Sequence, residues 1–130
     1  RQVQVGPKVC LINKYSASDG DLFPWGFRAL GLGKLIGTRT WGGIIGISGP
    51  LPYMDGTDIR VPFFTSYDPK TGSWIVENHG VDPDILIDND PIKEWNGEDE
   101  QLNKAIEEVM KELQDRKPLP PVPAPRDFSK

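Results

Sequence analysis

A short polar segment, Ser16-Ala-Ser-Asp-Gly-Asp21, lies between a pattern typical of a buried strand and apolar residues at helical spacing. A serine in such a turn is suited to nucleophilic chemistry, because its hydroxyl projects beyond the end of the sheet. The first N–H groups of the following helix would point toward an oxyanion formed beside it. The same spacing also fits an ordinary helix N-cap, so the residues alone leave catalysis and capping open.

Other residues that carry chemistry are few, since the chain has one histidine, His79, and one cysteine, Cys10. A lone cysteine excludes an intrachain disulfide and a cysteine-based zinc site, and a lone histidine excludes a His-rich metal cluster. We therefore expect no bound metal. One combination of residues that could act alone is a triad of Ser18, His79 and an acid such as Glu77 or Asp82.

The composition narrows the class of protein. With 130 residues, 37% of them apolar, the chain can form one domain, or part of one, with a buried core. Its net charge of −4 argues against a nucleic-acid partner bound through phosphates. No apolar run reaches the roughly 18 residues that a membrane span needs, and the N-terminus lacks a signal-peptide pattern. Six of the 15 basic residues fall in residues 1–43. They could form a solvated surface, or a basic rim around a site that receives a carboxylate.

The elements that must position the serine turn follow from the apolar pattern. Residues 8–13 are predicted to form a buried strand. A helix is predicted to begin close behind Ser18 and to be stopped by Gly31 and Gly33. A second strand follows at residues 34–37. This order of strand, turn, helix and strand indicates a crossover unit of the α/β class.

The rest of the chain is predicted to hold several strands and one clear helix. Apolar residues recur at helical spacing from about residue 98 to residue 114, which predicts an amphipathic packing helix capped by Asn96-Gly97. Residues 118–130 form a Pro-rich extended tail. The remaining strand candidates, joined by turns at Asp55-Gly56 and at residues 68–72, are residues 44–47, 58–61, 73–76 and 84–88.

Several ordered motifs resemble the tricorn proteases. Residues 13–21 and 30–43 are similar to the nucleophile region of that family, and residues 77–84 and 97–102 resemble later segments in the same order. The resemblance implies that residues 1–117 are the C-terminal part of a serine protease catalytic domain. It also implies an α/β core of ββα units, of the ClpP or crotonase-like kind.

Residue by residue, the resemblance implies that Ser18 is the nucleophile and that the backbone N–H of Asp19 is one oxyanion donor. Glu77 matches the acid that orients the catalytic base through a second serine. Ser16, two residues before Ser18, would be a neighbour that lines the site, and the nucleophile itself if the motif is aligned differently.

Two further positions concern the base. Gly43 stands where the related C-terminal processing peptidases carry a lysine, so no lysine at that position can activate Ser18. In the tricorn family the base histidine precedes the nucleophile, in sequence that these 130 residues do not contain. His79 is therefore expected to be structural or to line the site, and the self-contained triad is disfavoured.

The function implied is a serine peptidase that trims oligopeptides by acyl transfer without metal or organic cofactor, with this chain inactive alone. The expected partners are peptide substrates, upstream catalytic and accessory domains of the same protein, and further copies in a homo-oligomer. One cysteine suits the cytoplasm, although an upstream secretory signal would also be compatible. The alternative is a ligand-binding or assembly module of the same fold that keeps Ser-Ala-Ser-Asp as a turn and cap.

Overall fold

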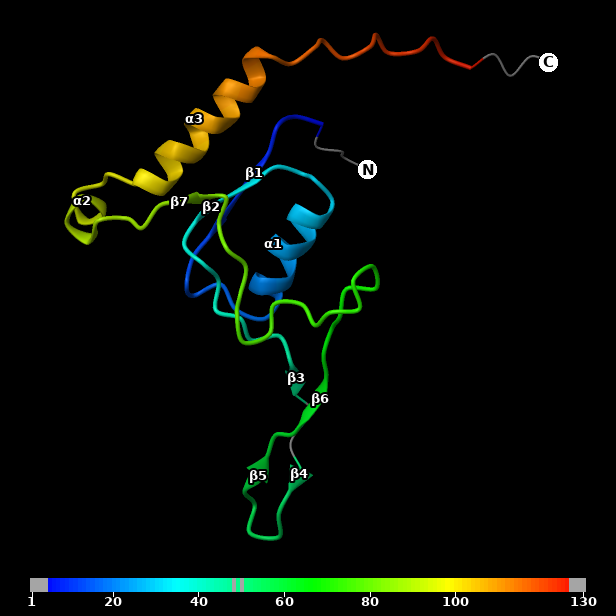
Figure 1. The fold of residues 1–130 in the computed structure, drawn as a ribbon, viewed down its shortest axis with the longest axis vertical. Coiled ribbons are helices and arrows are strands. Elements are labelled where there is room, and N and C mark those ends of the chain that lie inside the picture. The colour runs from blue at the N-terminus through cyan, green and yellow to red at the C-terminus, as the bar shows by residue number, and fades with distance from the viewer. Residues whose placement is uncertain (1–4, 48, 50, 127–130) are drawn as a thin grey trace.

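The computed structural model describes residues 5–47, 49 and 51–126 of the chain. Its centre is a parallel sheet of three strands in the order β1-β2-β7, in which helix α1 connects β1 to β2 (Figure 1). The mixed α/β class and the predicted strand–turn–helix–strand order are therefore confirmed. These elements are β1 (Val9–Ile12), α1 (Asp19–Ala29), β2 (Lys34–Gly37) and β7 (Ile85–Leu86), the last shorter than the predicted strand at 84–88.

The two faces of β1 pack against different helices. Ile12 is buried with Phe27 of α1 and with Leu35 of β2. Leu11 instead lines an apolar groove together with residues of α3 (Glu100–Gln114). Because successive side chains of a strand point to opposite faces of the sheet, α1 and α3 cover opposite faces.

Polar contacts fix α3 to both ends of β2. The side-chain amide of Gln101 donates to the carbonyl of Ile12 at 2.9 Å and to that of Ile36 at 2.7 Å. Farther along the helix the buried Glu108 pairs with Lys34 of β2. These contacts hold α3 in place although much of its apolar stripe stays exposed.

The predicted C-terminal helix is present as α3, but its predicted cap is wrong. Its N-cap is Asp99, whose carboxylate accepts from the amide of Leu102 at 2.9 Å. Asn96-Gly97 instead follow the end of α2 (Pro91–Trp95), a short helix that the apolar pattern did not predict because it buries no residue. Beyond α3 the described part of the Pro-rich segment runs to Arg126 without helix or strand. No helix in the described ranges is long and apolar enough to cross a membrane.

The middle of the chain forms an arm that extends away from the sheet (Figure 1). It consists of two short antiparallel pairs, and the turn predicted at Asp55-Gly56 joins the strands of the outer pair. The strand predicted at 58–61 is correct only in its first two residues. The arm pairs β3 (Gly46–Ile47) with β6 (Pro62–Phe64), and β4 (Leu51–Pro52) with β5 (Asp58–Ile59).

The strand predicted at 44–47 is confined to its second half, β3. The amides of Ile44 and Ile45 do not enter a ladder, because both donate to Oε2 of Glu77, at 2.7 and 2.9 Å. A side chain distant in sequence thus takes the place of a partner strand.

The strand predicted at 73–76 is wrong. Trp74 makes one isolated bridge with Tyr67, and the chain then turns. Val76 and Asn78 have φ of 64° and 61°, and this left-handed conformation is incompatible with an extended strand. The apolar run therefore leads into a tight turn.

Candidate active site

Ser18 occupies a strained position at the start of α1. It is the N-cap residue, is exposed, and has φ 55° and ψ −111°. A residue with a side chain rarely adopts this conformation, which costs on the order of 1–3 kcal/mol. Strained strand-to-helix turns present the nucleophilic serine in α/β-hydrolase folds. The predicted start of the helix directly behind Ser18 is confirmed.

The backbone N–H of Asp19 is available for an oxyanion. Asp19 is the first residue of α1, and the N–H groups of a helix's first turn have no acceptor within their own helix. Within the described residues no other acceptor is bonded to this N–H. The positive end of the helix dipole lies at the same place.

Asp21 is a site residue that the sequence analysis did not identify. Its side chain is fully buried, and its two carboxylate oxygens accept from three backbone amides. Oδ1 accepts from Gly42 at 2.8 Å, while Oδ2 accepts from Gly43 at 3.2 Å and from Ser18 at 3.0 Å. A signal was present, because an acid three residues after a serine cap is the spacing of a capping box.

Glu77 lies in the turn that replaces the predicted strand. It is half-buried, and its Oε2 holds the two amides of Ile44 and Ile45. The next residue in the turn, Asn78, donates its backbone N–H to the carbonyl of Gly42 at 2.8 Å. The turn that carries Glu77 is thus tied to the segment that contacts the serine turn.

At Gly42 and Gly43 the backbone leaves no room for a side chain, because neighbouring atoms lie too close. Gly42 has φ 87°, and a Cβ there would lie 2.5 Å from the amide nitrogen of Gly80. Gly43 packs beneath the indole of Trp41, and its carbonyl accepts from the Ser18 amide at 3.2 Å. Gly43 therefore lies beside Ser18.

Ser16 shapes the turn from within. Its hydroxyl oxygen accepts from the amide of Asn13 at 3.2 Å, and its carbonyl accepts from the amide of Trp41 at 2.9 Å. Because Ser16 is half-buried and bonded to its neighbours, it is less accessible than Ser18.

His79 is hydrogen-bonded to Asp82. The imidazole Nε2 lies 2.9 Å from Oδ2 of Asp82, whose Oδ1 accepts from Nε of Arg39 at 2.6 Å. The hydrogen bonds from His79 and then from Arg39 lower the pKa of the Asp82 carboxyl. In the described part of the chain no hydrogen bond joins His79 to Ser18 or Glu77.

The basic residues of the first third of the chain, which fit either a solvated surface or a basic rim, are partly neutralised. Arg28 pairs with Asp84 at 2.9 Å, and Arg39 is bonded to Asp82 as described above. The ammonium group of Lys14 lies 5.4 Å from the centroid of its neighbour's aromatic ring. Both arginines thus already have carboxylate partners.

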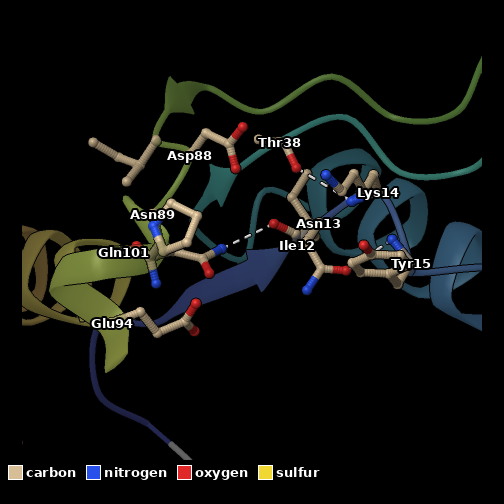
Figure 2. Close-up of a pocket in the computed structure, with 11 residues that line it drawn as sticks. Ile12, Asn13, Lys14, Tyr15, Thr38, Asp88, Asn89, Glu94 and Gln101 are labelled. Carbon is tan, nitrogen blue, oxygen red and sulfur yellow. Dashed lines mark hydrogen bonds between the residues drawn. The ribbon is translucent and has the colours of Figure 1, made fainter. Parts of the chain in front are cut away.

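A polar pocket of about 280 Å³ opens at the carboxyl ends of β1 and β2 (Figure 2). Ligands of open α/β sheets bind at this edge. Ser18 does not line this pocket, although the loop at Asn13 and Lys14 that leads to the serine turn does. Figure 2 labels most of the lining residues: Ile12, Asn13, Lys14, Tyr15, Thr38, Asp88, Asn89, Glu94 and Gln101.

Among the described residues no group of three or more His, Cys, Asp or Glu side chains could hold a metal.

Comparison with known proteins assigns the chain to a family of peptidases. Residues 1–87 match the model of peptidase family S41, so the chain belongs to that family. It is 45% identical over 109 residues to the tricorn protease of Thermoplasma volcanium and 44% identical over 108 residues to that of Thermoplasma acidophilum. These alignments cover 84% and 83% of this chain and 10% of each relative.

A solved structure agrees with the sequence relatives. A crystal structure of the tricorn protease aligns with a TM-score of 0.74 at 44% identity, covering 82% of this chain and 10% of that one. The resemblance to tricorn proteases is therefore confirmed. The chain spans about a tenth of the length of the curated relatives that it matches.

Proposed function

We propose that the protein is a serine peptidase of the tricorn type, in which Ser18 is the nucleophile. The observation that carries this proposal is the exposed, strained placement of Ser18 at the start of α1, in a chain of peptidase family S41. A structural cap alone would not need a conformation that costs free energy. The names of the relatives, which are proteases, agree with a peptide substrate.

The proposed reaction is acyl transfer to Ser18. Its Oγ attacks the carbonyl carbon of the scissile bond, and the Ser18 proton passes to a base while the carbonyl oxygen becomes an oxyanion near the Asp19 N–H. Collapse breaks the C–N bond, and the base returns the proton to the leaving amine. Water then attacks the acyl ester, releases the acid product and restores the Ser18 hydroxyl.

The base in this proposal is a histidine from outside the 130 residues. His79 is hydrogen-bonded to Asp82, which also pairs with Arg39, and this engagement supports a structural role for His79. Glu77 would orient the base through a further serine, and the polypeptide would need its other catalytic and accessory domains, assembled as a homo-oligomer. Oligopeptides are the proposed substrates.

The test is peptide hydrolysis by the full-length protein. We expect wild type to cleave fluorogenic oligopeptides and Ser18→Ala to lose this activity while keeping its fold, with Ser16→Ala as the matched serine control. Activity retained in Ser18→Ala would contradict the proposal.

A binding module of the same fold is the second candidate function, favoured by the pocket in Figure 2. It would show peptide binding without turnover in wild type.

A further inference from the structure

We propose that Asp21 is a positioning residue for the reaction of Ser18, because its buried carboxylate holds the serine turn against Gly42 and Gly43. The inference deepens the proposed function and rests on it. Asp21 lies within the first turn of α1 and does not contact the substrate in this proposal. It acts through the backbone.

The hydrogen bonds of Asp21 exceed what a helix cap requires. A capping box uses one bond from the side chain at this position to the amide of the N-cap residue, which the contact with Ser18 supplies. The bonds to Gly42 and Gly43 are additional, and they connect α1 to a segment about twenty residues later. A buried carboxylate is tolerated when its oxygens accept hydrogen bonds, and the three amides together occupy both oxygens of Asp21.

The same contact acts on the strained residue itself. The N–H of Ser18 points toward Oδ2 of Asp21 at 3.0 Å and toward the carbonyl of Gly43 at 3.2 Å. A charge-assisted bond of this kind is stronger than a neutral one, and it opposes relaxation of φ from 55°. Because Oγ is bonded to Cβ, two bonds from Cα, its position depends on that backbone conformation together with the rotamer of the side chain.

The segment also connects Ser18 with Glu77. Ile44, directly after Gly43, donates its amide to Glu77. Loss of the Asp21 contacts would therefore loosen the serine turn and its link to Glu77 at the same time. A displacement of about 1 Å at a reacting group can cost about 100-fold in rate.

The test compares Asp21→Asn with Thr40→Val in the full-length protein. Asparagine has nearly the size of aspartate but replaces one acceptor oxygen with a donor, so at least one of the three amides loses its partner. Thr40 is 3% exposed and accepts from the Val81 amide at 2.7 Å, so Thr40→Val removes a buried acceptor just before Gly42 without touching Ser18. Thermal unfolding measures how far each variant is destabilised.

We expect Asp21→Asn to lower kcat about 10- to 100-fold with KM within about 2-fold, and Thr40→Val to leave kcat within about 2-fold. Hydrogen exchange in peptides that contain Ser18 and Gly42 should rise in Asp21→Asn alone. Wild-type kcat in Asp21→Asn, or an equal loss in both variants, would overturn the inference.

Two controls keep the result interpretable. If Asp21→Asn does not fold, Asp21→Ser leaves room for water to accept from the amides and takes its place. Failure of both to fold would make Asp21 a determinant of folding alone and would contradict the inference. Ser18→Ala, measured in parallel, separates the two proposals: if it is as active as wild type, the proposed function fails and the inference with it. An active wild type, an inactive Ser18→Ala and an unaffected Asp21→Asn would refute only the inference.

Discussion

The carboxylates of Asp21 and Glu77 bind adjacent pairs of backbone amides in one segment, residues 42–45. Asp21 accepts from the first two residues of this segment and Glu77 from the last two. Asp21 belongs to the serine turn and Glu77 to a turn more than fifty residues later. The arrangement fixes both turns to one short stretch of backbone, so the geometry around Ser18 depends on two carboxylate side chains.

Replacement of Glu77 separates its two proposed roles. Glu77→Gln keeps an acceptor oxygen for Ile44 and Ile45 but removes the charge, so we expect kcat to fall about 10-fold or more with little change in stability. Glu77→Ala should also destabilise the protein by about 1–3 kcal/mol, because two amides lose their acceptor. Peptide hydrolysis and thermal unfolding of both variants measure these effects. Wild-type activity in Glu77→Gln would show that Glu77 is structural only.

The strained backbone at Ser18 predicts that a glycine variant is more stable than an alanine variant at this position. Ser18→Gly and Ser18→Ala both remove the hydroxyl, but only glycine adopts φ 55° without steric cost. We expect Ser18→Gly to be more stable than Ser18→Ala by roughly 1 kcal/mol or more. Denaturant unfolding of the two purified variants measures the difference. Equal stability would mean that the turn is relaxed in solution.

Gly42 should not tolerate a side chain. A Cβ at this position would meet the Gly80 backbone at 2.5 Å, and its φ of 87° already disfavours alanine. We expect Gly42→Ala to destabilise the protein by more than about 1 kcal/mol and to lower peptidase activity, because the stretch of backbone between the two turns must shift. Gly72→Ala is the matched control, since φ there is 70° and no atom lies near the added Cβ. An equal stability loss in both variants would attribute the effect to backbone conformation alone.

The hydrogen bonds of Asp82 predict that the stability of the folded protein depends on pH in the acid range. The hydrogen bonds from His79 and Arg39 lower the pKa of Asp82 in the folded protein below the unfolded value of about 3.9. Their contribution to stability is therefore present above about pH 4 and is lost as the pH falls through the folded pKa. Asp82→Asn should be less stable than wild type at pH 6, and the difference should shrink by pH 3. A difference that stays constant over this range would contradict the assignment.

The β1–α1–β2 unit could be predicted from the sequence because its signals are local. Apolar spacing marks both strands and the helix, and Gly31 lies just beyond the last turn of α1 with φ 63°. The same locality explains why the serine turn was found. Short elements such as α2 bury no residue and therefore left no apolar pattern.

The rest of the site depends on contacts between residues far apart in sequence. The apolar residues at 44–47 favour a strand, yet Glu77, about thirty residues later, takes the amides that would begin it. The hydrogen bonds of Asp21 to Gly42 and Gly43 likewise join residues about twenty positions apart in the sequence. Composition and periodicity carry no information on such pairings.

The most direct measurement of the central claim is covalent labelling of the full-length protein with a fluorophosphonate, mapped by peptide mass spectrometry. We predict one modified residue among residues 1–130, Ser18, and no modification of this segment in Ser18→Ala under conditions where the fold is retained. Labelling at Ser16, or no labelling of this segment in a preparation that hydrolyses peptides, would contradict the assignment of Ser18 as the nucleophile.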